Sequence, residues 1–199
     1  MQIKTNFKAV TTDNSNLLGF ADATFDNSIH VKDIAVFKSN GGITLKMPSY
    51  KTGEETEFGF PERKDHFYPT TKEARDALTE LVEKAMAHPE HYSYLNDKVK
   101  AGFSIKTHEY SPEGSNIRGY ANVKLGDEYA FNCQIRENKN GKFMVSYPGE
   151  SFQAGDKSGF KKFVAPTKDK DGLITASIIK EFKANLKLEP EPPPPVMPI

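Results

Sequence analysis

Cysteine is almost absent from this chain of 199 residues, and tryptophan is missing altogether. The single cysteine, Cys133, cannot form an internal disulfide, which indicates a reducing compartment and excludes a zinc site built from several cysteines. No stretch approaches the roughly 20 apolar residues that a membrane-spanning helix needs. The first residues, Met1 to Asn6, lack the apolar core of a signal peptide. We therefore expect a soluble cytoplasmic protein without a membrane partner.

The chain also has no excess of positive or negative charge. The 27 Lys and Arg residues balance 27 Asp and Glu residues, so the formal net charge is zero. A neutral protein has no long-range attraction for a polyanion, and nucleic-acid binding would need a local group of basic residues. The 14 Phe and 8 Tyr residues are typical of a folded protein. The length allows one large domain or two small ones.

The sequence contains an internal repeat. Gly19-Phe20-Ala21 recurs as Gly119-Tyr120-Ala121, and this offset of 100 residues holds without a gap for about thirty residues. The matched positions include Phe25 with Leu125, Ile29 with Tyr129, Val31 with Phe131, Asp33 with Cys133, Leu45 with Val145 and Pro48 with Pro148. After a small deletion, Phe67-Tyr68-Pro69-Thr70 aligns with Val164-Ala165-Pro166-Thr167. The pattern predicts a duplicated fold.

Each copy begins with a pattern typical of β-strands. Apolar residues alternate with polar ones over residues 43–47 and again over 143–147, which predicts strands with one buried face. Asn40-Gly41-Gly42 and Asn140-Gly141 supply the positive-φ residues of a hairpin turn before these strands. The apolar phase changes between Val31 and Ile34, which predicts a β-bulge near Lys32-Asp33 or a strand covered on both faces.

A helix ends each copy. In the first, Thr70 and Glu73 form a capping-box pattern, and His88-Pro89 ends the helix. The apolar face of this helix consists of Ala74, Ala77, Leu78, Leu81, Val82, Ala85 and Met86. The second helix carries Ile174, Ile178, Phe182 and Leu186 at spacings of four.

The sequence thus predicts an α+β fold of two tandem copies, each a small antiparallel sheet with a C-terminal helix. The expected boundaries are 1–88 for copy 1, 89–102 for a partly docked linker, 103–188 for copy 2 and 189–199 for a Pro-rich extended tail. The copies are expected to pack as a pseudo-dimer within a monomer, which would cover the edge strand that a single copy exposes. Two independent domains on a string are the alternative.

The first copy resembles the bacterial SpoVG family, the stage V sporulation protein G or septation regulators. The most specific segments are Val31-Lys32-Asp33-Ile34 and, at a fixed distance, Met47-Pro48-Ser49. The second copy keeps the spacing but has Cys133, Tyr147 and Gly149 where the first has Asp33, Met47 and Ser49. The resemblance implies a sheet-plus-helix fold that works as a dimer, binds DNA or RNA with little sequence preference, and affects septation and sporulation.

Five lysines are the candidate nucleic-acid-binding residues: Lys51, Lys157, Lys161, Lys162 and Lys168. Lys51 follows the Met-Pro-Ser segment, where the family usually has a basic pair, and the other four are interleaved with Phe160 and Phe163. Lysines neutralise phosphates and aromatic rings stack on unpaired bases. The alternative is a solvated strand whose phenylalanines face the core.

Other chemistry has little support in the sequence. His88 and His91 stand three residues apart without a nearby cluster of Asp or Cys, and no cofactor, metal or catalytic site is expected. His66 next to Asp65 has no nucleophile motif beside it, so we expect no enzyme. The leading interpretation is a nucleic-acid-binding regulator. The alternative is a protein-interaction module that has lost nucleic-acid binding and uses a sheet edge or the Pro-rich tail, which could hold a protein partner.

Overall fold

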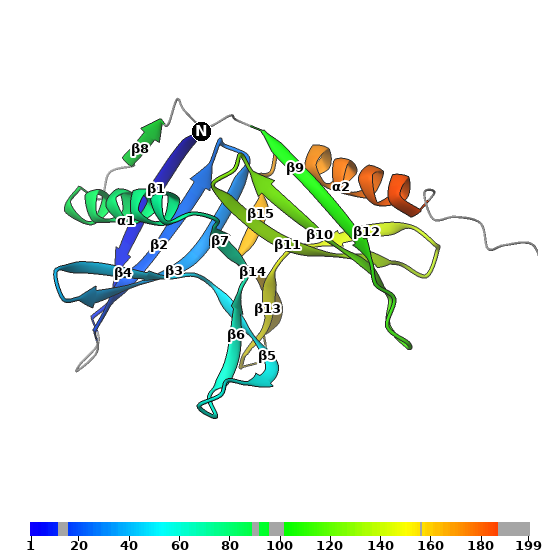
Figure 1. The fold of residues 1–199 in the computed structure, drawn as a ribbon, viewed down its shortest axis with the longest axis horizontal. Helices are drawn as coiled ribbons and strands as arrows, with labels where there is room; N and C mark the ends of the chain where they lie inside the picture. The colour runs from blue at the N-terminus through cyan, green and yellow to red at the C-terminus, as the bar shows by residue number, and fades with distance from the viewer. Residues whose placement is uncertain (12–15, 89–91, 96–101, 156, 187–199) are drawn as a thin grey trace, which may run out of the picture.

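The computed structural model describes residues 1–11, 16–88, 92–95, 102–155 and 157–186, and it shows two sheet-plus-helix units side by side (Figure 1). The first sheet has the order β15-β3-β2-β1-β8, with β4 beside β3. Its strands from the first half are β1 (Gln2–Ala9), β2 (Leu17–Phe25), β3 (Ile29–Ser39) and β4 (Gly42–Lys46), joined by β8 (Tyr92–Leu95). Helix α1 (Lys72–Ala87) covers this sheet.

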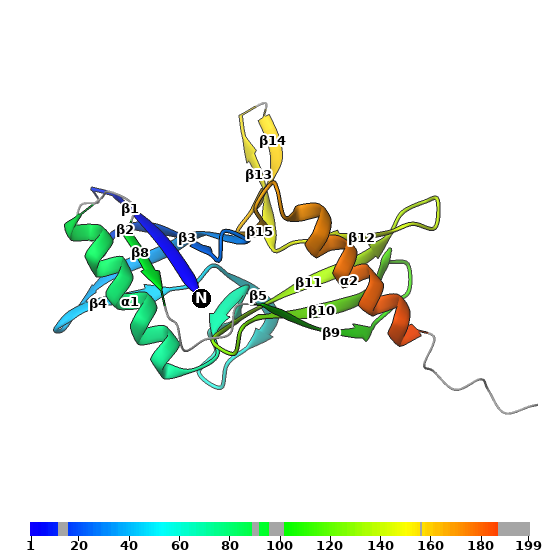
Figure 2. The same cartoon turned by 90° about the horizontal axis from the view of Figure 1, so that it is seen from above.

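The second sheet repeats this plan. Its strands are β9 (Phe103–Glu109), β10 (Ile117–Leu125), β11 (Tyr129–Glu137) and β12 (Phe143–Ser146). Helix α2 (Asp171–Leu186) packs against β9 and β12, and Figure 2 shows the two helices toward opposite ends of the molecule. The α+β class expected from the sequence is confirmed.

The two units exchange short strands. β7 (Phe67–Pro69) precedes α1 but pairs with β11 of the second sheet, where Phe67 lies opposite Phe131. β15 (Val164–Pro166) precedes α2 but pairs with β3 of the first sheet, where Val164 lies opposite Val31. Each unit therefore completes the sheet of the other, as a pseudo-dimer within one chain would.

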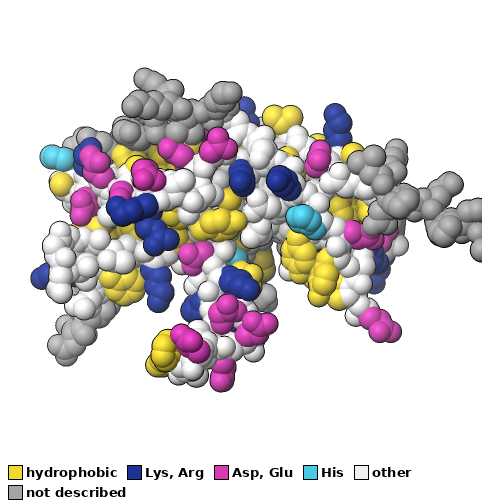
Figure 3. Space-filling model, viewed as in Figure 1, with side chains coloured by type: hydrophobic (Ala, Val, Ile, Leu, Met, Phe, Trp, Pro, Cys, Tyr) yellow, Lys and Arg dark blue, Asp and Glu magenta, His cyan; other side chains and the backbone are white. Residues whose placement is uncertain are grey.

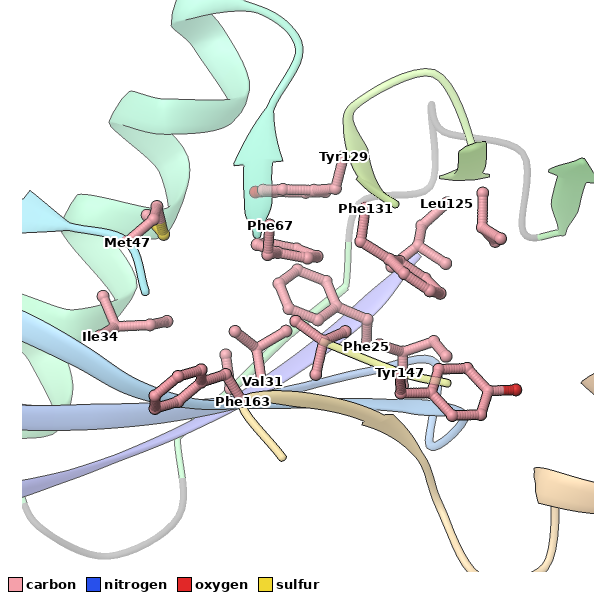
Figure 4. Close-up of a cluster of buried hydrophobic side chains, with 14 of the residues drawn as sticks. Phe25, Val31, Ile34, Met47, Phe67, Leu125, Tyr129, Phe131, Tyr147 and Phe163 are labelled. Atoms are coloured by element: carbon pink, nitrogen blue, oxygen red, sulfur yellow. The ribbon is translucent and has the colours of Figure 1, made fainter. Parts of the chain in front are cut away.

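A single hydrophobic core joins the units. The Phe25 ring lies 4.9 Å from the Phe67 ring and 4.7 Å from the Tyr129 ring, all three buried at the junction (Figure 4). The Tyr129 hydroxyl donates a hydrogen bond of 2.9 Å to the carbonyl of Ala74 in α1. Aromatic contacts of this kind add to the energy of apolar burial. The units are consequently packed together rather than strung as independent domains.

The β-bulge expected near Lys32-Asp33 is confirmed. Ala21 pairs with Ile34 and Ala23 with Val31, so two residues of β3 oppose one residue of β2, and Asp33 has a φ of 59°. The second unit has no bulge here, because Ala121 pairs with Cys133 in an unbroken register. Cys133 therefore occupies the place of Ile34. The sequence alignment of Asp33 with Cys133 was wrong, because the bulge adds one residue to β3 and shifts the true match by one position.

The cap of the first helix lies one residue later than the sequence predicted. The hydroxyl of Thr71, not of Thr70, accepts a hydrogen bond from the Ala74 amide at 3.1 Å. Thr70 instead bonds to the second unit: its amide donates to the Glu128 carbonyl at 2.7 Å and its hydroxyl donates to the Asp127 carbonyl. Thr70, which the local sequence pattern assigns to the helix cap, is therefore used in the contact between the units.

Part of the segment between the two units forms a strand. Residues 92–95 of the 89–102 segment form β8, which pairs with β1. The Pro-rich tail, 189–199, lies outside the described residues. None of the helices in the described part of the chain has the length and apolarity needed to cross a membrane.

Replacing Leu78 or Ile178 by alanine should lower the free energy of unfolding by roughly 2–5 kcal/mol, because each side chain is fully buried and alanine leaves a cavity. Chemical denaturation followed by circular dichroism measures this. Leu173→Ala is the matched control in α2, since Leu173 is 66% exposed and its loss should change stability by less than about 0.5 kcal/mol. Losses below about 1 kcal/mol at both buried positions would contradict the packing.

Replacing Phe25 by alanine should destabilise both units together, by roughly 3–5 kcal/mol, because this ring contacts Phe67 and Tyr129 in the shared core. Hydrogen exchange read by mass spectrometry should show α1 and α2 opening with the same reduced protection. Unchanged protection of α2 beside a loosened α1 would mean that the units unfold independently.

The intact chain should be a monomer in solution, because the exchanged strands fill both sheets from within one molecule. Light scattering at micromolar concentration should give the mass of one chain. A stable dimer at that concentration would contradict this expectation.

Candidate functional site

Two hairpins leave the middle of the molecule on the same side in Figure 1 and diverge from each other in Figure 2. One consists of β5 (Ser49–Glu55) and β6 (Pro61–Asp65), the other of β13 (Gly149–Ala154) and β14 (Lys157–Lys162). They differ in charge. Residues 49–65 contain five acidic and three basic residues, whereas residues 149–162 contain two acidic and three basic residues. Figure 3 shows the acidic side chains gathered on the β5–β6 hairpin.

The base of the β13–β14 hairpin and the first sheet enclose an open groove of about 670 Å³, named here the basic groove. Three of the predicted lysines, Lys161, Lys162 and Lys168, line it. His30 and Lys32 of β3 line the same groove, as do two aromatic residues of the hairpin, Phe152 and Phe160. The exchange of β15 produces this arrangement, because it places the segment around Lys168 next to β3.

Lys161 is tied to the bulge. Its Nζ lies 2.6 Å from Asp33 Oδ2, and this carboxylate oxygen is buried. The backbone amide of Asp33 in turn donates a hydrogen bond of 3.1 Å to Oδ1 of Asp22. Removing the Lys161 ammonium would leave the buried Asp33 oxygen without its charged partner, which is unfavourable. Lys161 therefore holds the second hairpin against the first sheet as well as lining the groove.

Lys32, Lys162 and Lys168 have exposed side chains along the groove. The Lys162 ammonium lies 5.6 Å from the centre of the Tyr147 ring, a cation–π distance. Sequence reasoning missed Lys32, although the predicted bulge beside it was the available signal. A bulge turns side chains away from the regular alternation of a strand.

Lys51 and Lys157 stand apart from this group. Lys51 is exposed on β5, opposite Arg63 of β6, in the acidic hairpin, and it does not line the basic groove. Lys157 begins β14 opposite Ala154, and its side chain lies outside the described residues. The structure thus brings three of the five predicted lysines together.

His30 adds a titratable group to the basic groove. Its Nδ1 lies 2.8 Å from the hydroxyl of Thr24. Burial lowers the pKa of His30 below its usual value, with Lys32 acting in the same direction and Asp22 opposing it. The ring is accordingly neutral at pH 7, and the positive charge of the groove at that pH comes from its lysines.

A second cavity, of about 530 Å³, lies between the β5–β6 hairpin and the second sheet and is named here the aromatic cavity. Tyr50, Tyr120 and Phe160 contribute aromatic rings, and Asn132, Gln134 and Arg136 contribute amide and guanidinium groups. Phe160 lines both this cavity and the basic groove, so the two spaces meet at its ring. Among the described residues, no lysine lines the aromatic cavity.

Tyr50 and His66 form one wall of the aromatic cavity, and their rings belong to a stack that continues to Phe163 behind it. The His66 ring lies 4.9 Å from the Tyr50 ring and 5.7 Å from the Phe163 ring, at small interplanar angles. Burial lowers the pKa of His66, Arg63 acts in the same direction and Glu150 opposes it. Burial also raises the pKa of the neighbouring Asp65 carboxyl. His66 is thus held as a neutral stacked ring.

Cys133 is buried at the edge of the aromatic cavity. Burial raises the pKa of its thiol to about 12, so the reactive thiolate is not populated near neutral pH. Within the described residues, no three His, Cys, Asp or Glu side chains group as a metal site requires. Of the two histidines noted in the sequence, His91 lies outside the described part of the chain.

Comparisons with known proteins identify the first half of the chain. Residues 1–88 match the SpoVG family model. A protein of Archaeoglobus fulgidus, named as a candidate septation protein SpoVG, is 31% identical over 77 residues, which cover 39% of this chain and 84% of that relative. No solved structure matches the chain. Since the similarity extends over most of the relative's length, the chain belongs to the SpoVG family.

Proposed function

We propose that this protein is a regulator of the septation and sporulation type that binds DNA or RNA at the basic groove. The observation that carries the proposal is the meeting of Lys32, Lys162 and Lys168 in one groove of about 670 Å³, two of them from the second half and one from the first. In a chain of zero net charge, such a local group is the means of attracting a phosphate backbone.

The surroundings of the lysines support a polyanionic ligand. The second hairpin has more basic than acidic residues, and its Phe152 and Phe160 rings are 46% and 52% exposed beside the groove. Aromatic rings next to phosphate-binding lysines suit single strands, whose bases are free to stack. Lysine contacts to phosphates fix the position of the ligand without reading its sequence, so the sequence preference is weak.

We further propose that residues 103–188 are a divergent SpoVG copy, and that the chain forms internally the pair which two family chains would otherwise make. The shared order of elements and the exchange of β7 and β15 support this. Under this proposal each half has a different role at the basic groove. The first half supplies β3 with Lys32, and the second half supplies the hairpin with Lys162.

A protein partner is the second candidate function. Phe58 and Phe60, at the end of the acidic β5–β6 hairpin, are 76% and 69% exposed. Exposed aromatic side chains are enriched in contacts between proteins. The acidic residues around them disfavour phosphate, so this hairpin would bind a protein rather than a nucleic acid.

Reversing the charge of Lys162 and Lys168 together (K162E/K168E) should weaken binding of every nucleic-acid sequence about equally, because phosphate contacts carry no sequence information. For the wild type, a plot of log affinity against log salt should have a slope of roughly −2 to −4, as expected for three or four neutralised phosphates. Fluorescence anisotropy with mixed single-stranded and double-stranded DNA and RNA at two or more salt concentrations measures both effects.

The matched control is K139E/K142E, which makes the same change in net charge at exposed lysines in the turn before β12, outside both cavities. This control should keep most of the affinity. Lys161 is left unchanged in both variants. Replacing it would break its ion pair with Asp33, and a loss of binding could then result from a loss of structure. Absence of binding by the wild type at low salt would overturn the proposal and favour a protein partner.

A further inference from the structure

The aromatic cavity and the basic groove are two neighbouring spaces with different chemistry. The groove carries lysines, whereas the described lining of the cavity has one carboxylate, Asp65, one guanidinium, Arg136, and no lysine. The charges of Asp65 and Arg136 balance in this lining, so the cavity has no net positive charge with which to attract a phosphate. The cavity therefore suits a neutral ligand, and its volume of about 530 Å³ lies in the range of roughly 300–1,000 Å³ typical of small-molecule sites.

We propose that the aromatic cavity receives an unpaired nucleobase of a strand whose phosphates lie in the basic groove. The proposal rests on the proposed nucleic-acid binding and specifies its ligand as single-stranded. A base is neutral and flat, and its edges carry hydrogen-bond donors and acceptors. The cavity offers ring faces together with amide, hydroxyl and guanidinium groups, which are the groups that bind unstacked bases.

Phe160 is the element that connects the two spaces. Its ring packs over the backbone of Gly149, where a Cβ atom would lie only 2.7 Å from the ring, so a residue larger than glycine would displace it. Across the same hairpin the Phe152 ring lies over Gly159 in the same way. The two glycines thus fix the rings in place. A ring held in this manner and still 52% exposed is a ready stacking surface.

The polar groups of the cavity are also positioned in advance. Arg136 donates to Gln134 Oε1 at 2.6 and 3.1 Å, which holds the Gln134 amide in one orientation. Asn132 Oδ1 accepts from Asn122 at 2.9 Å, so its amide is held as well. Side chains fixed by such partners lose little entropy when they bind a ligand. Their donors and acceptors would read the edge of a base.

The stacked rings of Tyr50 and His66 form another wall of the cavity. Tyr50 is 44% exposed and stands on the His66 ring, which its environment keeps neutral. The base would be seated near this wall, with Phe160 between it and the lysines. A duplex cannot present a base in this way, because its bases are paired and stacked within the helix.

The test compares a natural single strand of about 12 nucleotides with the same strand carrying abasic sites, a length within the range of small single-strand-binding domains. Both strands have the same phosphates, so a difference between them reports contacts to bases. Fluorescence anisotropy of end-labelled strands should show the natural strand binding wild type roughly 10-fold more tightly. Phe160→Ala should remove that difference and leave the salt slope unchanged.

Two further variants serve as controls for the effect of Phe160→Ala. Phe160→Leu keeps an apolar contact over Gly149 without a π face and should lose the preference for bases while unfolding at the temperature of the wild type. Phe58→Ala removes an aromatic ring that is 76% exposed and lies outside both cavities, and it should bind both strands as the wild type does.

The outcomes separate this inference from the proposed function. Equal binding of natural and abasic strands by the wild type, with the expected salt slope, would overturn the base site and leave phosphate binding in place. Binding that requires bases and Phe160 but ignores salt and K162E/K168E would support the base site and overturn the lysine groove. Binding of neither strand would overturn both.

Discussion

The reciprocal exchange of two short strands is the interaction on which the rest of this structure depends. β7 leaves the first unit to pair with β11, and β15 leaves the second to pair with β3. Matching hydrogen bonds close both exchanges: Thr70 donates its amide to the Glu128 carbonyl, and Thr167 donates its amide to the Ser28 carbonyl at 2.8 Å. Backbone pairing satisfies edges that each unit would otherwise expose. The shared aromatic core and the positions of both hairpins follow from it.

The exchange also explains why both cavities lie at the junction of the units. Each hairpin directly precedes an exchanged strand, so it stands against the sheet of the other unit. The two resulting spaces meet at Phe160 and differ in chemistry, because one hairpin carries an excess of acidic residues and the other does not. A single chain with two units can vary the two sites independently, which a dimer of identical chains cannot do.

The bulge at Asp33 shows how one residue makes the halves unequal. It places a carboxylate where Lys161 of the second hairpin can reach it, at 2.6 Å. The second sheet lacks the extra residue and has buried, unreactive Cys133 in regular register instead. The ion pair fixes one hairpin against the first sheet. The other hairpin is held differently: His66 stacks on Phe163, and Tyr68 accepts a hydrogen bond of 3.1 Å from Asn122.

The sequence by itself determined the elements that depend on local pattern. Alternation of apolar residues, glycine turns and helix periodicity predicted the repeated sheet-plus-helix units, and the phase change in β3 predicted the bulge. Pairing between distant segments was decided only by the tertiary structure, because a strand of three residues such as β15 carries no signal of its partner. Thr70 bonds across the junction and leaves the cap to Thr71, and Lys32 joins lysines more than a hundred residues away. Charge and shape at such a site arise from packing, which local sequence does not encode.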